Sequence, residues 1–322
     1  MAALTTYHFL FKVEVVTPLE LDEHSGSALR GNLFEAVWRR FCTNKASATC
    51  AECPLHSMCP VSALVAPLRE ENPRGRDIPR PYIILPPLAE ARRYAPGEQL
   101  SFGLTLFGNI VQLLPYIIMS VGTLEECGLG RKLKEHGGQR GRFKVKRIES
   151  HNPLSAERQV LYEAGKPLVG VPTLSVTTAG VQEKAATLPV EKVTLNFLTP
   201  TRITDQDHLL HHAEFRPLIH RLLERLSALE DAYGIGDERI TFERQSFIEC
   251  AEHVKCVDDV TRWEEVQSYS HRTKRLTPIG GLVGKAAFAG DLTPFRELLT
   301  WGELVHIGKS CVKGNGWYKI EQ

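Results

Sequence analysis

Four cysteines within an 18-residue stretch carry the clearest chemical signal in the sequence. They are Cys42, Cys50, Cys53 and Cys59, with the spacing C-x7-C-x2-C-x5-C. Four thiolates are the ligand set of a closed tetrahedral zinc site, and C-x2-C is a usual spacing between two of the ligands. We therefore expect a structural zinc ion, because four protein ligands leave no open position for catalysis. The alternatives are His56 in place of one thiolate, an iron–sulfur cluster with similar ligands, and reduced cysteines without metal.

A glycine-rich basic segment near the C-terminus, residues 306–318, is the second signal. Lys309 and Lys313 lie among its glycines. Glycine lets a backbone approach a ligand closely, and successive N–H groups can then point at a phosphate. The spacing is not that of a nucleoside-triphosphate loop, and no helix follows as in a dinucleotide site. An ordinary hairpin is the alternative. The glycines are Gly308, Gly314 and Gly316.

The elements that position the cysteines belong to the N-terminal half. Apolar and β-branched runs predict strands, and a 3.6-residue period predicts a first helix that ends at the cysteines. The order strand, helix, strands, helix, strand resembles one ferredoxin-like unit with insertions. The predicted elements are strands at 7–16, 82–85, 99–107 and 143–148, a helix at 28–41, and a second helix from 108 to about 127 with Pro115 near its start or at a kink.

The C-terminal half repeats this order around the glycine-rich segment. We predict strands at 193–198, 247–254, 264–269, 280–288 and 317–320, a turn at 199–201, and helices at 215–233 and 295–299. The fold class is therefore α+β, with two tandem ferredoxin-like domains. The first spans 1–170 with a cysteine-rich insertion at about 42–60. The second spans 190–322 with the glycine-rich loop at 308–316, and the boundary falls between 150 and 190.

Length, composition and net charge limit the classes of protein to which this chain can belong. The chain has 322 residues, 43% of them hydrophobic, and a formal net charge of +1. This length predicts two domains, and the charge argues against a broadly polybasic protein. The apolar run at 110–121 is interrupted by Gln112 and Pro115 and is too short to span a bilayer. We expect a cytoplasmic protein without membrane association.

The near-zero net charge conceals two basic tracts. Residues 131–147 hold eight Lys and Arg against one acid, a local charge of +7, and residues 271–319 hold eight against three, a local charge of +5. Concentrated basic tracts in a near-neutral chain are typical of a protein that binds RNA on one face. A solvated basic loop is the alternative for the first tract. Candidate contacts in the two tracts are Arg142, Lys144, Lys146, Arg272 and Lys274.

Several segments of the chain resemble one protein family. Residues 278–285 (PIGGLVGK), Gly290-Asp291-Leu292 and 302–316 are similar to the C-terminal domain of CRISPR precursor-RNA processing endoribonucleases of the RAMP superfamily. Residues 198–202 resemble the opening of that domain. Residues 27–31 and the cysteine cluster resemble the N-terminal half of one branch. The chain departs from the family at Ser268-Tyr269-Ser270, where Arg-Tyr-Ser usually precedes an arginine.

The resemblance implies RNA-binding, RRM-like domains and metal-independent cleavage of precursor crRNA. The 2′-hydroxyl would attack the adjacent phosphorus and leave 2′,3′-cyclic phosphate and 5′-hydroxyl ends, with no cofactor for catalysis. Histidine suits the proton transfers because its ordinary pKa lies near neutrality. His24 precedes the first helix, where related nucleases often place an acid or base, and His306 adjoins the glycine-rich segment. Lys309 would stabilise charge on the phosphate.

The implied partners are CRISPR repeat RNA or precursor crRNA, and an effector complex. The first alternative is a non-catalytic RAMP subunit that holds guide RNA in such a complex. The second is a zinc-containing DNA-binding regulator built around the cysteine cluster, which leaves the C-terminal resemblance unexplained. The RNA contacts expected in addition to the basic tracts are Arg30, Gly308, Lys313, Gly314 and Gly316.

Overall fold

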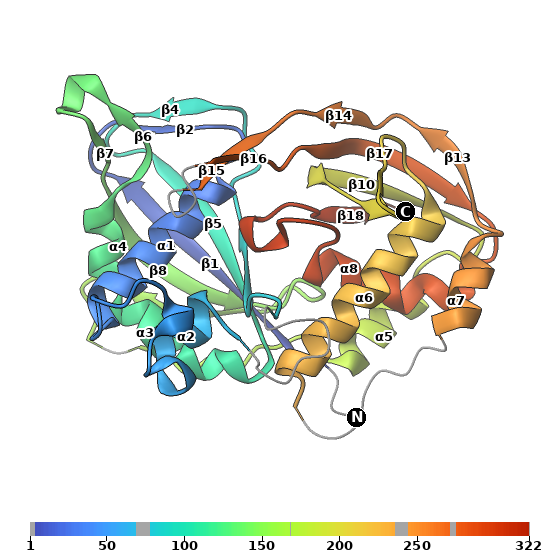
Figure 1. Cartoon of the computed structure of the whole chain (residues 1–322), viewed down its shortest axis with the longest axis horizontal. Helices are drawn as coiled ribbons and strands as arrows, with labels where there is room; N and C mark the ends of the chain where they lie inside the picture. Colours follow the sequence, from blue (N-terminus) through green and yellow to red (C-terminus); the bar gives the residue numbers. More distant parts are fainter. Residues whose placement is uncertain (1–3, 69–77, 168, 236–243, 271–274, 322) are drawn as a thin grey trace. The chain divides into compact units, whose positions relative to one another are not determined.

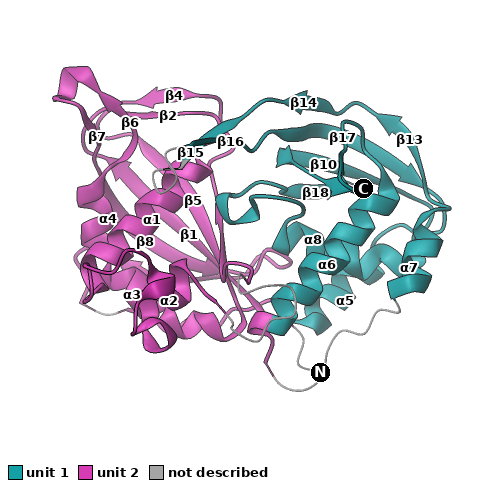
Figure 2. Cartoon of the chain, in the orientation of Figure 1, with its two compact units in different colours: residues 1–3, 177–231, 236–322 teal, residues 4–176, 232–235 magenta. Residues whose placement is uncertain are grey.

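The chain divides into two compact units, described here from a computed structural model (Figures 1 and 2). The structure describes residues 4–68, 78–167, 169–235, 244–270 and 275–321. Leu4–Val176 and Ala232–Ile235 form the N-terminal unit, and Thr177–Asp231 and Gly236–Gln322 form the C-terminal unit.

A five-stranded antiparallel sheet is the frame of the N-terminal unit. Its order is β3-β5-β1-β8-β9. Without the edge strand β9, this is the 2-3-1-4 order of a ferredoxin-like fold, with α1 after the first strand and α4 before the last. The elements are β1 (Thr6–Val15), α1 (Gly26–Phe41), β3 (Tyr82–Leu85), β5 (Gln99–Phe107), α4 (Val121–Cys127), β8 (Phe143–His151) and β9 (Arg158–Glu163).

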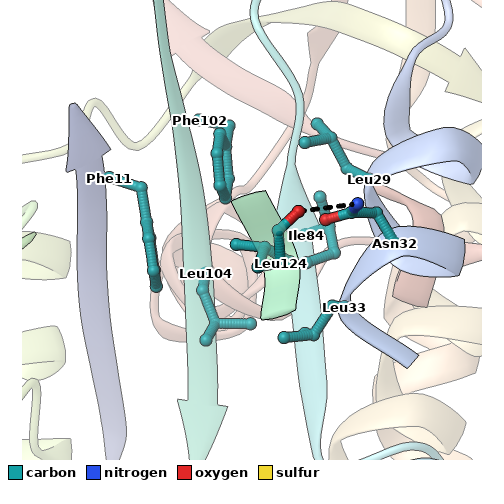
Figure 3. A pocket seen from close by; sticks show the side chains of 8 residues that line it. All are labelled: Phe11, Leu29, Asn32, Leu33, Ile84, Phe102, Leu104 and Leu124. Carbon is teal, nitrogen blue, oxygen red and sulfur yellow. Dashed lines mark hydrogen bonds between the residues drawn. The ribbon is translucent and has the colours of Figure 1, made fainter. Parts of the chain in front are cut away.

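The core of this unit consists of alternate side chains along the strands and of side chains one helical turn apart on the first helix. Phe9, Phe11 and Val13 of β1 are buried, and so are Leu29 and Leu33 of α1. Figure 3 shows a small cavity between these layers, lined mainly by apolar side chains. Its lining residues are Phe11, Leu29, Asn32, Leu33, Ile84, Phe102, Leu104 and Leu124.

Asn32 is the polar member of that lining. Its side-chain amide donates to the carbonyls of Leu124 at 3.2 Å and Gly128 at 2.6 Å. These bonds tie α1 to the end of α4 inside an apolar environment, where an unpaired amide would be costly.

Shorter elements complete the N-terminal unit. The single helix predicted from 108 to about 127 is wrong, because the segment bends into a 3-10 turn and two helices, with Pro115 in the first turn of the second piece. The additional elements are β2 (Leu19–Leu21), η1 (Cys50–Glu52), η2 (His56–Met58), α2 (Pro60–Val65), β4 (Arg92–Tyr94), η3 (Gly108–Leu113), α3 (Leu114–Met119), β6 (Leu129–Leu133), η4 (Lys134–His136) and β7 (Gln139–Gly141).

The C-terminal unit repeats the same topology. Its sheet order is β13-β17-β10-β18, again 2-3-1-4, and β14 also pairs with β17. The prediction of tandem ferredoxin-like domains is confirmed. The elements are α5 (Thr178–Ala186), β10 (Lys192–Thr201), β11 (Thr204–Asp205), β12 (His208–Leu209), α6 (Phe215–Tyr233), α7 (Arg244–Ala251), β13 (Lys255–Asp259), β14 (Arg262–Glu264), β15 (Gln267–Ser270), β16 (Arg275–Pro278), β17 (Gly281–Ala289), η5 (Thr293–Phe295), α8 (Arg296–Val305), η6 (Cys311–Lys313) and β18 (Tyr318–Glu321).

Two predictions for this unit are wrong. The strand predicted at 247–254 is largely the helix α7, which turns Phe247 against Phe295 with ring centroids 5.5 Å apart and buries Ala251 one turn later. The turn predicted at 199–201 is a continuation of β10. Its register shifts between Phe197 and Thr201, and such irregularities accommodate a proline in a strand.

Among the described residues, no single helix is long and apolar enough to cross a membrane. One bent pair, Gly108–Met119 and Val121–Cys127 with a 60° break, matches a span by length and composition only.

Candidate nucleic-acid interface

The glycine-rich loop between α8 and β18 is folded back against β10. Ile307 donates its N–H to the carbonyl of Gly316 at 3.0 Å, and Gly316 donates to the carbonyl of Pro200 at 3.1 Å. A Cβ on Gly316 would lie 1.8 Å from the oxygen of Ile307, and one on Gly308 would lie 2.4 Å from the oxygen of Arg202. Both glycines also have positive φ, at +73° and +82°. Close backbone packing therefore requires these glycines, independently of any ligand.

The buried part of this loop is not presented for RNA contact. Gly314 and Gly316 are buried, and Gly308 is half-buried. The RNA contacts predicted at these three glycines stay predictions, and the buried Gly314 and Gly316 offer little surface for them.

His306 lies in the core of the C-terminal unit. Its side chain is 1% exposed, and Nδ1 lies 3.1 Å from the carbonyl oxygen of Asn315. The imidazole stacks on Trp317 with ring centroids 5.8 Å apart and an interplanar angle of 6°. Burial lowers the pKa of His306 to about 3, so the ring is neutral near pH 7. The structure therefore assigns His306 a packing role in place of the predicted proton transfer, because a covered imidazole cannot reach a substrate.

The two lysines of the loop differ in the exposure of their side chains. Lys309 is exposed, and its backbone N–H is held by the carbonyl of Arg202 at 3.0 Å. Lys313 is half-buried and donates from Nζ to the hydroxyl of the buried Ser268 at 2.9 Å, which ties the loop to β15. Lys309 is thus the better placed of the two for contact with a phosphate.

Acidic residues from other elements offset much of the basic tract at 131–147. Arg131 pairs with Glu20 and Asp22 at 3.2 and 2.6 Å. Lys144 pairs with Glu125 of α4 at 2.6 Å. The local charge of +7 is therefore not the charge that this surface presents.

Strand β1 supplies a further acid, Glu14, which pairs with Lys146 at 3.3 Å. Arg142 is different: its side chain is exposed, its backbone N–H donates to the hydroxyl of Thr17, and no carboxylate of the described residues pairs with it. Of the three predicted contacts on this tract, Arg142 is the most available. Arg272 and Lys274 lie outside the described residues.

A buried carboxylate, Glu149, anchors three cations on the same sheet. Lys12 and Arg147 lie 3.0 Å from it and Arg158 lies 3.4 Å from it. Burial acts to raise the pKa of Glu149, but hydrogen bonding and charge from these partners hold it below its usual value. Glu149 and Glu125 are residues that the sequence reasoning missed, since no local pattern links an acid to a cation on a distant strand.

The two N-terminal candidates lie at the first helix. His24 is half-buried in the turn before α1, and Ser25 occupies the N-cap position. Arg30 is half-buried on α1, with Cζ 5.7 Å from the ring centroid of Phe34. His24 is therefore accessible in a way that His306 is not.

The four cysteines lie near one another, from the end of α1 to the start of α2, and the other three act electrostatically on Cys50. All four are half-buried. Burial raises the pKa of Cys50, and the thiols of the other three raise it further, against a hydrogen bond from Ser62 that lowers it. No three of these sulfur atoms, all within the described residues, lie mutually within 4.8 Å, so a shared metal would draw them together.

Hydrogen bonds around the cluster suit thiolate ligands. The backbone of Leu55 lowers the pKa of Cys53 through a hydrogen bond to its sulfur. His56 points Nε2 at the carbonyl oxygen of Ala66, 3.1 Å away, so that ring nitrogen is already engaged. The donor set thus fits a metal that is held by the four thiolates, with Cys42 capping the end of α1 and Cys59 starting α2.

Comparison with known proteins identifies the family. A model described as an N-terminal domain (AF_1859_N) matches residues 4–174, and a model described as CRISPR-associated endoribonuclease Cas6 matches residues 195–318. Residues 195–318 thus match the Cas6 family, which supports a CRISPR-associated Cas6-type protein. The resemblance to CRISPR-associated RNA-processing endoribonucleases is thereby confirmed.

One relative and two solved structures resemble this chain over nearly its whole length. An uncharacterized protein of Archaeoglobus fulgidus is 26% identical over 301 residues, covering 92% of this chain and 91% of that protein. A solved Cas6 of Thermus thermophilus is 16% identical with a TM-score of 0.54, and the match covers 100% of both chains. A partial Cas6-RT-Cas1–Cas2 complex gives a TM-score of 0.59 at 11% identity, covering 99% of this chain and 46% of that one. At these identities the solved structures show a shared fold.

Proposed function

We propose that this Cas6-family protein binds CRISPR repeat RNA and cleaves precursor crRNA without a metal ion. The 2′-hydroxyl upstream of the scissile bond attacks the adjacent phosphorus, and the bond to the departing 5′ oxygen breaks. The products carry a 2′,3′-cyclic phosphate and a 5′-hydroxyl. The match of residues 195–318 to the Cas6 endoribonuclease model carries this proposal.

The reaction needs a base for the 2′ proton, an acid for the leaving oxygen and a cation for the charge on phosphorus. His24 is the imidazole that we assign to proton transfer, because it is half-buried whereas His306 is covered. Lys309, exposed on the glycine-rich loop, is the cation that we assign to the phosphate. Because the 2′-hydroxyl is the nucleophile and histidine side chains can transfer protons near neutral pH, the reaction needs no metal-bound water.

Recognition of the RNA follows from the surface charges. Arg142 contacts phosphate directly, whereas Lys144 and Lys146 must first break their ion pairs with Glu125 and Glu14. The largely exposed Lys146–Glu14 pair is worth about 1 kcal/mol or less, so a phosphate can replace that carboxylate, whereas the buried Glu125 holds Lys144 more firmly. Binding should therefore weaken as salt rises.

Cleavage of repeat RNA in EDTA tests the proposal. Wild-type protein should yield cyclic-phosphate ends, His24→Ala should lose about 100-fold or more in rate, and the exposed control His253→Ala should cut normally. Loss of cleavage in EDTA, or an unchanged rate in His24→Ala, contradicts the proposed chemistry. RNA that is bound but left intact by the wild type would instead favour a non-catalytic RNA-binding subunit.

We further propose that the cysteine cluster holds a structural zinc ion. The four thiols, the hydrogen bond to Cys53 and the position of Cys42 at the end of α1 support this site. The ion would fix an insertion whose own helices are only three to six residues long. Cys53→Ser should lower the zinc bound per chain and the unfolding temperature, whereas Cys127→Ser, outside the cluster, should change neither. Equal zinc content in wild type and Cys53→Ser would contradict the site.

A further inference from the structure

An aromatic pair lies on the surface of the C-terminal unit. The imidazole of His211 contacts the indole of Trp263, with ring centroids 4.4 Å apart and the two ring planes tilted by 43°. His211 is exposed and Trp263 is half-buried, so the imidazole forms the outer layer and the indole supports it. The proton-transfer chemistry and the cysteine cluster use neither residue.

The indole is held in place from several sides. Trp263 lies on β14, where its register partner is the buried Leu282 of β17 (Figure 1). Its ring N–H donates to Glu265 at 2.7 Å, and the guanidinium carbon of Arg202 lies 5.6 Å from the ring centroid. A ring fixed in this way loses little freedom when a ligand stacks above it.

The segment that carries His211 is also anchored on both sides. Leu210 donates its N–H to the carbonyl of Ile203 at 3.0 Å, and Ala213 donates to the carboxylate of Asp259 at 3.0 Å. His211 is therefore presented by a fixed backbone, although it lies outside regular secondary structure.

Arg202 joins this aromatic pair to the glycine-rich loop. Its side chain faces Trp263, and its backbone carbonyl accepts the N–H of Lys309 at 3.0 Å. An aromatic face beside exposed positive charge is the combination that binds single-stranded nucleic acid, in which bases stack on rings and cations meet the phosphates. Bases within a duplex are already stacked on each other and would not be available.

We infer that His211, supported by Trp263, is a stacking platform for one base of single-stranded RNA, next to the phosphate contact at Lys309. This inference rests on the proposed function, because it assigns a binding subsite for the same RNA. The exposed imidazole face accepts any base, since every base offers a π face.

Binding of repeat RNA tests the platform. The RNA carries 2′-deoxyribose at the scissile nucleotide, mapped from the cleavage products, so that it is bound but not cut. Losing one stacked base should raise the dissociation constant of His211→Ala by about 5- to 100-fold. His211→Phe should bind like the wild type, because it restores an aromatic face. The matched control is His208→Ala, an exposed histidine on the nearby strand β12.

Salt dependence separates stacking from charge. The slope of log K against log salt should stay unchanged in His211→Ala, whereas Lys309→Ala should reduce it by about 0.7, the value for one phosphate contact with a single strand. Two results overturn the inference even if the wild type still cleaves repeat RNA. One is wild-type affinity in His211→Ala, and the other is a loss of affinity in His211→Phe as large as that in His211→Ala. A wild-type protein that leaves unmodified repeat RNA uncut defeats the proposed function instead.

Discussion

Replacing Gly316 with alanine should destabilise the C-terminal unit, because two separate costs meet at this position. The first is the positive φ of +73°, which costs an L-residue about 1–2 kcal/mol. The second is the new Cβ, which would lie 1.8 Å from the carbonyl oxygen of Ile307 and must push it away.

Pushing Ile307 away from Gly316 would also disturb two backbone hydrogen bonds that these two residues make. Ile307 donates to Gly316 at 3.0 Å, and Gly316 donates to Pro200 at 3.1 Å. Loss of these bonds adds about 1 kcal/mol each. The total is about 3–4 kcal/mol, which corresponds to a fall of roughly 6–15 °C in the unfolding temperature of a unit of this size.

Gly97→Ala is the matched control. Gly97 also has positive φ, at +88°, but a Cβ there would meet no atom within 4 Å. Its replacement should therefore cost only the backbone strain of about 1–2 kcal/mol, partly offset by the reduced freedom of the unfolded chain. Thermal unfolding of both variants without RNA, followed by circular dichroism, gives the comparison. If Gly316→Ala loses no more stability than Gly97→Ala, the assignment of this glycine to backbone packing is wrong.

Two further predictions concern buried polar groups. Because burial holds the pKa of His306 near 3 in the folded protein, the unfolded chain binds an extra proton between about pH 6.5 and 3, so stability should fall as the pH is lowered through that window. In His306→Asn the fall measured by urea denaturation should be shallower by up to about 1.4 kcal/mol per pH unit, and an identical slope would refute the burial argument. Asn32→Ala should cost about 2–4 kcal/mol, because the carbonyls of Leu124 and Gly128 lose their donor, whereas exposed Asn109→Ala should cost less than about 0.5 kcal/mol.

Local patterns predicted most of the fold that positions the site. The strands at 82–85 and 99–107 and the helix at 215–233 match their predicted bounds, because period and turn residues are strong there. Errors arose where tertiary packing outweighs local preference. Residues 244–251 form a helix because Phe247 packs on Phe295, a contact between residues far apart in the chain.

The roles of the candidate residues were less predictable than the elements that carry them. Sequence position placed His24 and His306 on equal terms, and only burial separated them. The glycines of residues 306–318 were recognisable as a motif, but contact with the backbones of Ile307 and Arg202 shows what they do. Arg202, Trp263 and His211 carry no sequence signal as a group, since β-pairing and a separate hairpin bring them together.

The sequence by itself determined the family, the order of elements in each half and the cluster of four cysteines. Each of these depends on residues close together in the chain or on motifs that can be recognised without the structure. Only the tertiary structure decided which groups are buried and which charges remain. Eight basic residues at 131–147 predicted a strongly positive surface, yet sheet pairing and helix packing bring Glu14, Glu125 and Glu149 to them. Charge at a surface depends on distance in space, and the fold sets that distance.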